Sequence, residues 1–179
     1  PPSVGPARMT SDVAVMTACT GFLDLSARVL EPGFEYQATL ESEMEAAVAA
    51  GGTSPACPSD TDPPLDEPVL VEMLKHRARS LNRAHVYPVG ALTQGLRGET
   101  ITEMGELVDA GCVAFSQADA PLADTQVLLR AMQYAATFGY RVWLRPEEAH
   151  LARGGHAHDG EIALGVGLAA LPAAAEPSA

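Results

Sequence analysis

Ser26 and Arg28 are polar side chains two positions apart at the end of an apolar run, just before the turn sequence Glu31-Pro32-Gly33. On a β-strand, residues two apart point to the same face. A polar pair at the carboxyl end of such a strand is well placed for catalytic or binding chemistry. A metal centre there would favour a pair of histidines, and this chain offers a hydroxyl and a guanidinium instead.

The carboxyl ends of the other expected strands also carry polar residues. They are Ser59 and Asp60, then Thr93 and Gln94, then Gln117, Ala118 and Asp119, and finally Arg145, Glu147 and Glu148. In parallel α/β folds, the active groups gather at this end of the strands. The set contains no histidine, although a zinc site would need several histidine or carboxylate groups converging there.

A His-x-His pair followed by a carboxylate occurs later in the chain, at His156, His158 and Asp159. These residue types can bind zinc. However, glycines bound the segment 154–160, and it follows the last expected strand. This context favours a solvated polar loop, with a metal site as the alternative.

Other motifs are sparse. The chain has no glycine-rich phosphate loop and no G-x-S-x-G nucleophile elbow. The basic run KHRARSLNR at 75–83 is typical of a solvated helix face, and contact with an acidic partner is the alternative reading.

Composition narrows the classes of function. The chain has 179 residues and a formal net charge of −12, which argues against nucleic acid or an anionic membrane as a partner. No apolar run is long enough to span a membrane, and the first residues do not resemble a secretory signal. The three cysteines, Cys19, Cys57 and Cys112, are far apart, so we expect small core residues in a reducing cytoplasm.

Hydrophobic spacing and turn residues divide the chain into alternating strands and helices. Residues 1–12 are an expected loose lead-in, 13–29 are extended, and 173–179 are an expected disordered tail within the low-complexity segment 163–179. Strands are predicted over 53–58, 84–92, 112–116 and 140–145, and helices over 38–52, 67–82, 98–111 and 124–139.

Two details of these helices are also predicted. In the helix predicted over 38–52, Leu40, Met44, Ala47 and Val48 share one face. The helix predicted over 98–111 is capped by Thr100 or Thr102 and ends at Gly111.

The alternation indicates an α/β fold with a parallel sheet and helices outside it. About five β/α units fit into residues 13–172. A closed eight-fold barrel typically needs about 250 residues, so the sequence predicts either an open doubly wound sheet or part of a barrel. A five-unit piece would leave sheet edges and apolar faces exposed.

Three stretches of the sequence resemble the dihydroorotases, cyclic-amide hydrolases of the amidohydrolase superfamily. They are 22–52, beginning FLDLSARVLEPG, 57–78, beginning CPSDTDPP, and 85–149, beginning HVYPVGAL. The likeness covers roughly residues 18–172. It implies a partial TIM-type (β/α) barrel of the metallo-dependent hydrolase kind.

The first strand of the resembled family ends in His-x-His-x-Arg-Glu-Pro-Gly, where the two histidines bind zinc and the arginine holds the substrate carboxylate. The corresponding positions here are Ser26, Arg28 and Leu30, and only the Glu-Pro-Gly turn matches. Asp60 stands for an asparagine of the substrate loop, Gln117 or Ala118 for a bridging carboxylate, and Arg145 for a further zinc-binding histidine. A hydroxyl and a methyl group are poor zinc ligands, and a guanidinium repels the metal.

This pattern resembles the non-catalytic branch, the pseudo-dihydroorotases, which keep the barrel and associate with aspartate carbamoyltransferase. The resemblance implies a catalytically inactive, metal-free protein of pyrimidine biosynthesis. Its expected partner is the catalytic chain of aspartate carbamoyltransferase, and a homo-oligomer is a further expectation. One alternative is an active zinc dihydroorotase that interconverts carbamoyl-aspartate and dihydroorotate, with zinc held by His156, His158 and Asp159. The other is a truncated chain without function.

Overall fold

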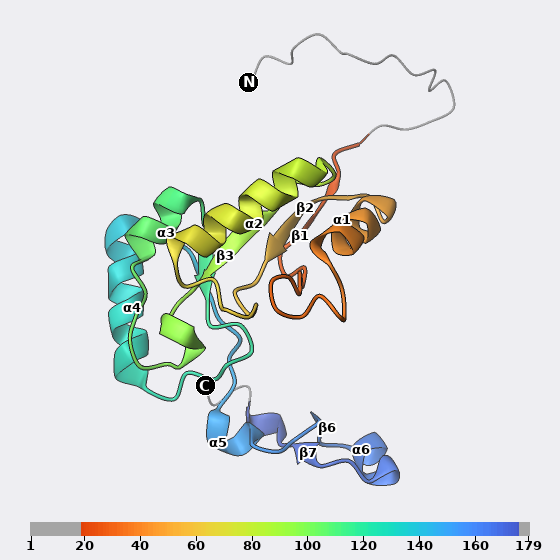
Figure 1. Ribbon diagram of the computed structural model, residues 1–179. Helices are drawn as coiled ribbons and strands as arrows, with labels where there is room; N and C mark the ends of the chain where they lie inside the picture. Colours follow the sequence, from red (N-terminus) through yellow and green to blue (C-terminus); the bar gives the residue numbers. More distant parts are fainter. Residues whose placement is uncertain (1–18, 176–179) are drawn as a thin grey trace.

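The computed structural model describes residues 19–175 of the protein. Five parallel strands form one sheet in the order β1-β2-β3-β4-β5. Their bounds are β1 Phe22–Asp24, β2 Gly52–Cys57, β3 Tyr87–Ala91, β4 Ala114–Ser116 and β5 Val142–Trp143. Each strand lies next to the one before it in sequence, and the sheet is curled into one side of a barrel (Figure 1). The prediction of a partial (β/α) barrel is therefore confirmed.

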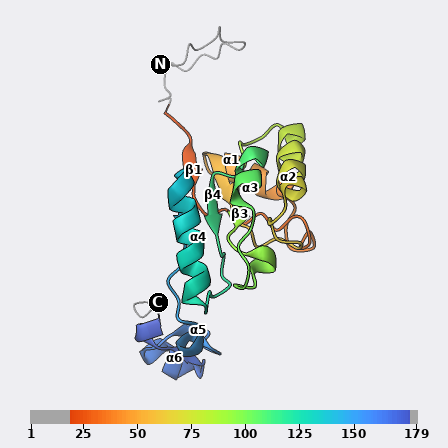
Figure 2. The ribbon, with the colours of Figure 1, turned by 90° about the vertical axis from the view of Figure 1, so that its left-hand side faces the viewer.

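Four helices connect the strands and cover the outer face of the sheet. They are α1 Leu40–Ala49, α2 Pro68–Leu81, α3 Met104–Ala110 and α4 Thr125–Phe138, and a 3-10 turn, η1, spans Gln94–Leu96. Figure 2 shows α1, α2 and α3 on one side of the strands, with α4 running alongside them. Within residues 19–175, no helix combines the length and the apolar character needed to cross a lipid bilayer.

The helix ends follow from local sequence. Thr39 and Ser42 form a reciprocal capping box at the start of α1. Pro68 occupies the first turn of α2, where its missing N–H costs nothing. Asp124 accepts hydrogen bonds from the backbone N–H groups of Gln126 and Val127 at the start of α4. Gly139 ends α4 in a left-handed conformation, as the sequence predicts.

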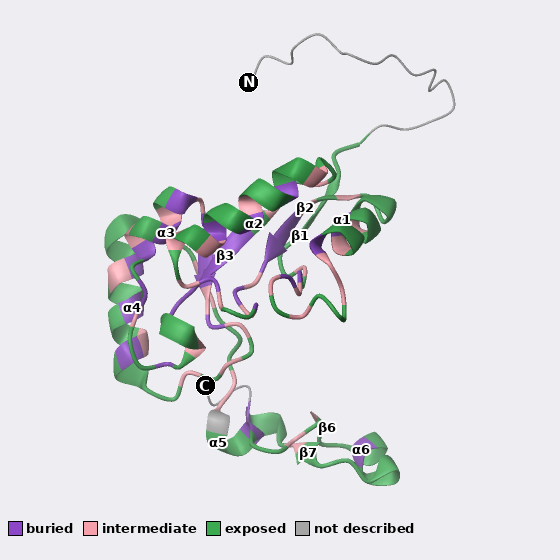
Figure 3. Ribbon diagram, viewed as in Figure 1, coloured by how far each residue is buried: buried purple, intermediate pink, exposed green. Residues whose placement is uncertain are grey.

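Alternation along the strands builds two apolar layers. Val89 pairs with Ala114 on the inner face, and the next residues, Gly90 and Phe115, pair on the outer face. The outer layer, between sheet and helices, holds most of the buried side chains, including Phe115 and Leu107. Figure 3 shows that the buried positions fall on β2 and β3 and on parts of the helices. The inner layer is smaller and contains Ala56, Val89, Ala114 and part of Trp143. This inner layer forms the floor beneath the carboxyl ends of the strands.

Three element predictions need correction. Of the extended run 13–29, only Phe22–Asp24 is a strand among the described residues, because a turn follows at once. The third helix begins at Met104 without a threonine cap, since the Thr102 hydroxyl donates to the Ala91 carbonyl oxygen at 2.7 Å. Val48, expected on the buried face of α1, is 44% exposed.

The chain continues past β5 into a smaller unit. It contains α5 Ala149–Ala152, β6 Ala157–His158, α6 Glu161–Val166, β7 Ala170–Leu171 and a 3-10 turn, η2, at Ala173–Ala175. β6 and β7 pair in parallel as a separate two-stranded sheet. The loop predicted at 154–160 therefore contains a short strand, and part of the low-complexity segment 163–179 is regular. The expected lead-in 1–12 and residues 176–179 lie outside the described residues.

Candidate functional site at the carboxyl ends of the strands

A pocket of about 350 Å³ lies at the carboxyl ends of the five-stranded sheet. We call it the mouth pocket. Its walls come from the ends of β1, β2, β4 and β5 or the segments that follow them, and β3 contributes Val89 from its middle. The lining residues are Leu25, Ser26, Arg28, Pro58, Asp60, Val89, Ser116, Ala118, Asp119, Trp143, Leu144 and Arg145. In a parallel α/β architecture, this end of the sheet is where functional groups gather.

Ser26 and Arg28 reach the mouth pocket from the turn after β1 and not from a strand. The Ser26 N–H donates to Asp24 Oδ1 at 2.9 Å, which tightens this turn. The Ala27 N–H donates to the Ala56 carbonyl oxygen at 2.9 Å and so fixes the segment against β2. Ser26 and Arg28 line the same pocket because these two hydrogen bonds fix the turn, and not because the two residues lie on one face of a strand.

Two arginines and three carboxylates form a charge network across the mouth. Arg28 pairs with Asp60 at 3.3 Å and also with Asp119. Arg145 pairs with Asp119 at 3.6 Å and with Glu147 at 3.4 Å. These residues follow β1, β2, β4 and β5, so the network links the ends of four strands.

The network pairs the charged side chains at the mouth but contributes little to the free energy of unfolding. The side chains of Arg28 and Asp119 are 52% and 56% exposed, so water screens their attraction. Such exposed pairs contribute about 0 to 1 kcal/mol each. Their chemical consequence is larger, because the carboxylates that could face a cation already face guanidinium groups.

Gln117 and Ala118 are adjacent, but only Ala118 lines the mouth pocket. Gln117 is buried, with its Oε1 accepting from the Thr93 hydroxyl and its Nε2 donating to the Leu96 carbonyl oxygen, each at 2.9 Å. Of this adjacent pair, the side chain that reaches the mouth pocket is therefore the methyl group of Ala118. Neither Thr93 nor Gln94, both expected at the strand ends, lines the mouth pocket.

Leu30 and Glu31 also lie outside the mouth pocket. Glu31 is 3% exposed, and its Oε2 accepts from the Leu40 N–H at 2.8 Å. Its Oε1 lies 2.6 Å from Arg77 Nη1, an ion pair that lacks the alignment of a hydrogen bond. The Glu-Pro-Gly turn is thus connected to the start of α1 and to α2. The sequence contained no signal for this contact, because Arg77 is remote from Glu31 along the chain.

His156, His158 and Asp159 lie on or beside β6 in the smaller unit, and all three are exposed. His158 Nδ1 is 3.0 Å from the Asp159 carbonyl oxygen. Across residues 19–175, no three histidine, cysteine or acidic side chains are grouped as a metal site would require. None of the three lines the mouth pocket.

Zinc does not fit the donor set of the mouth pocket. The positions nearest the strand ends provide a serine hydroxyl, an alanine methyl and two guanidinium groups. Zinc in proteins is held by thiolate, imidazole or carboxylate ligands. Asp60 and Asp119 are carboxylates, but both are paired with Arg28.

Two buried cysteine thiols of the core are poor nucleophiles. Burial raises the pKa of Cys57 to about 12, and the nearby Asp24 carboxylate adds to this effect. Burial also raises the pKa of Cys112 to about 12, although the Lys75 ammonium opposes it. Since the thiolate is the nucleophile, neither residue is suited to covalent catalysis near neutral pH.

The sequence of this chain is similar to those of known proteins. The family described as Dihydro-orotase-like matches residues 16–178. A dihydroorotase-like protein of Pseudomonas aeruginosa is 44% identical over 170 residues, which are 95% of this chain and 40% of that protein. A dihydroorotase-like protein of Pseudomonas putida is 42% identical over 161 residues, covering 90% of this chain and 38% of the relative.

A dihydroorotase of Syntrophotalea carbinolica is 36% identical over 168 residues, covering 94% of this chain and 40% of that protein. The chain therefore spans about two fifths of the length of these relatives. The five parallel strands, the intervening helices and the match over residues 16–178 lead to one assignment. The chain belongs to the dihydroorotase-like family.

Proposed function

We propose that this chain is a catalytically inactive, metal-free, dihydroorotase-like protein of cytoplasmic pyrimidine biosynthesis, acting as a structural partner of aspartate carbamoyltransferase. One observation carries the proposal. At the mouth pocket, Arg28 and Arg145 stand at the positions that the resemblance assigns to metal ligands, and their charges are paired with Asp60, Asp119 and Glu147.

Electrostatics explains why this arrangement disfavours a divalent cation. A metal in the pocket would lie beside the Arg28 and Arg145 guanidinium groups, and like charges repel, although water weakens the repulsion because both side chains are about half exposed. It would also have to separate Asp60 and Asp119 from Arg28 before either could serve as a ligand. The residues that remain, Ser26 and Ala118, offer weak donors or none.

The rest of the five-stranded unit has capped helices and a packed core, which favours a structural role over a catalytic one. The capping box of α1, the Asp124 cap of α4 and a continuous outer core are all in place. The residues of the mouth pocket therefore do not suit metal binding, whereas the helices that would form a surface for a partner are intact. The partner part of the proposal rests on the resemblance to the non-catalytic branch, whose members associate with aspartate carbamoyltransferase.

Metal analysis and an activity assay test the catalytic part. We expect the purified chain to contain far less than one zinc per molecule and to leave dihydroorotate unhydrolysed, even with added zinc. The dihydroorotase of Syntrophotalea carbinolica, treated identically, is the matched control. One tightly bound zinc together with turnover above the protein-free rate would overturn the proposal.

Association is tested separately. We expect this chain, mixed with the catalytic chain of aspartate carbamoyltransferase, to elute with it as one species of fixed stoichiometry in size-exclusion chromatography. Separate elution at micromolar concentration, from a chain that shows a cooperative unfolding transition, would overturn the partner role. A chain with no cooperative transition would instead support the alternative of a truncated product and would also contradict the proposal.

A further inference from the structure

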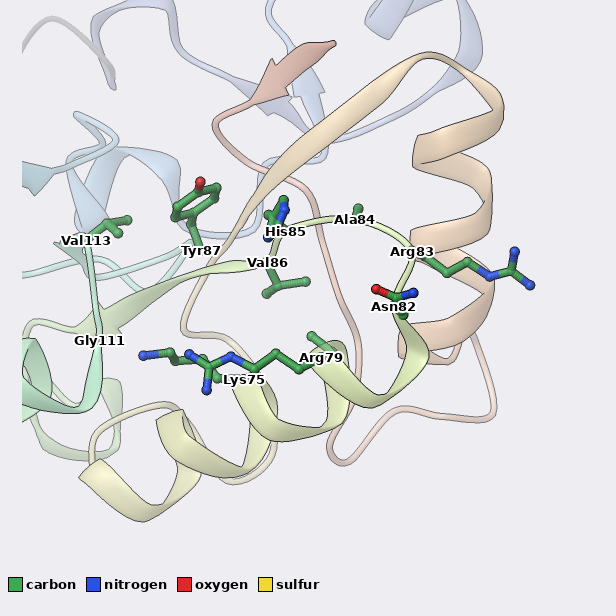
Figure 4. Close-up of a pocket in the computed structure, with 11 residues that line it drawn as sticks. Lys75, Arg79, Asn82, Arg83, Ala84, His85, Val86, Tyr87, Gly111 and Val113 are labelled. Atoms are coloured by element: carbon green, nitrogen blue, oxygen red, sulfur yellow. The ribbon is translucent and has the colours of Figure 1, made fainter. Parts of the chain in front are cut away.

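A second cavity, of about 550 Å³, lies at the amino ends of β3 and β4, opposite to the mouth pocket. We call it the basal cavity (Figure 4). Four of its lining residues, Lys75, Arg79, Arg83 and His85, can carry a positive charge. The others are Ala78, Asn82, Ala84, Val86, Tyr87, Gly111 and Val113, so no carboxylate from the described part of the chain, residues 19–175, lines it. This is a marked local contrast in a chain of net charge −12.

The head of Lys75 is held in a defined place. Lys75 Nζ donates to the Ala110 carbonyl oxygen at 2.7 Å, at the end of α3. Gly111 leaves room for it, because a Cβ there would lie 1.8 Å from Nζ. An ammonium group has three N–H donors, so two remain for a ligand. Fixing this flexible side chain in advance reduces the entropy that binding would cost.

Arg79 lies one helical turn after Lys75 on α2, and Figure 4 shows both side chains extending along the cavity toward Gly111. Like charges four residues apart on a helix repel each other. Arg83 turns away in Figure 4 and pairs with Glu45 on α1 at 3.1 Å. Arg79, in contrast, forms no ion pair within residues 19–175. An anion between Lys75 and Arg79 would relieve their repulsion.

We propose that the basal cavity binds an oxyanion, a phosphate or carboxylate group, of a small molecule, with Lys75 and Arg79 as the charged contacts. An ammonium supplies a point charge, and a guanidinium supplies paired donors that match oxyanion geometry. The volume lies within the range of small-molecule sites. The site is separate from the mouth pocket, so this inference is independent of the proposed function. At the amino end of the strands, the ligand would act on stability or assembly and not on turnover.

Isothermal titration calorimetry of the full chain tests the proposal, with inorganic phosphate, pyrophosphate and succinate as probes. We expect at least one probe to bind with 1:1 stoichiometry, and its affinity to fall as salt rises. Arg79→Gln should weaken that binding by about tenfold. Arg130→Gln removes the same charge from an exposed position on α4 and should change the affinity by less than about twofold.

Chemical modification gives a second readout that does not depend on a substitution. An amine-reactive acylating reagent should label Lys75, and the bound probe should slow this labelling several-fold. Three results would overturn the proposal: no binding of any probe, equal weakening in the Arg79 and Arg130 variants, or binding that leaves Lys75 labelling unchanged. Saturable binding of an acidic peptide without binding of any small probe would identify a protein-docking surface and would equally contradict it.

Discussion

Two arginines show how burial decides the energetic role of an ion pair. Arg28 meets the exposed Asp119 and the partly buried Asp60, whereas Arg77 meets Glu31, which is 3% exposed. An exposed pair loses little when broken, because water solvates both charges. A buried carboxylate that loses its partner retains its desolvation cost. The two sites therefore separate the chemical role of a charge from its structural role.

Substitution of each arginine by methionine tests this distinction. Arg28→Met should lower the free energy of unfolding by less than about 1 kcal/mol, because its pairs are screened. Arg77→Met should lower it by about 2 kcal/mol, because Glu31 Oε1 is left buried and unpaired. Urea unfolding followed by circular dichroism measures both. Equal losses in the two variants would contradict the assignment of a structural role to Glu31 and Arg77.

Thiol reactivity provides a second test at the residue scale. Cys19 is exposed, while burial raises the pKa of Cys57 and Cys112 to about 12. A thiol with this pKa is about 0.01% thiolate at pH 8, so alkylation should be negligible. Iodoacetamide at pH 8 should therefore modify Cys19 alone, and all three cysteines in denaturant. Peptide mass spectrometry gives the readout, and native labelling of Cys57 would show that its strand opens readily.

At the scale of elements, two of the helices that begin after an acidic N-cap residue, α3 and α4, differ in how well they are capped. Asp124 accepts from the Gln126 N–H at 2.7 Å at the start of α4. Glu103 holds the same position before α3 but makes no side-chain hydrogen bond to the helix. The first satisfies free backbone donors, and the second contributes only its charge near the helix start.

Alanine substitution at both caps should give unequal losses. Asp124→Ala should reduce the free energy of unfolding by about 1 kcal/mol, because the backbone donors of the first turn lose their acceptor. Glu103→Ala, the matched control, should reduce it by less than about 0.5 kcal/mol. Thermal unfolding at constant pH provides the comparison. A loss at Glu103 as large as that at Asp124 would mean that charge and not capping stabilises these helices.

Sequence patterns predict an element well where local signals agree. Pro68 and the regular apolar spacing of α2, and Gly139 at the end of α4, mark helices that the structure contains. The predicted start of α3 is too early. The Thr102 hydroxyl donates to the Ala91 carbonyl oxygen of β3, a contact between elements that no local rule describes. Ser26 and Arg28 line the same pocket, as predicted, but they do so from a turn and not from a strand. The orientation of Gln117 depends on Thr93 and Leu96 from another loop.

At the scale of the whole molecule, the five-stranded sheet has two edge strands among residues 19–175. In this part of the chain, β1 pairs only with β2, and β5 pairs only with β4. Two of the three residues of β1 are apolar and exposed, Phe22 at 70% and Leu23 at 59%. Unpaired backbone groups on an apolar edge favour association with another chain. The purified chain should therefore self-associate through β1 as its concentration rises.

A charge on the edge strand should block this association. Leu23→Lys should weaken self-association by about tenfold, because lysine on an edge strand opposes pairing. Ile162→Lys is the matched control, because Ile162 is 84% exposed on α6, outside the five-stranded sheet. Sedimentation equilibrium of the three proteins measures the effect. A wild-type chain that stays monomeric, or equal weakening in both variants, would show that the edge of β1 does not mediate association.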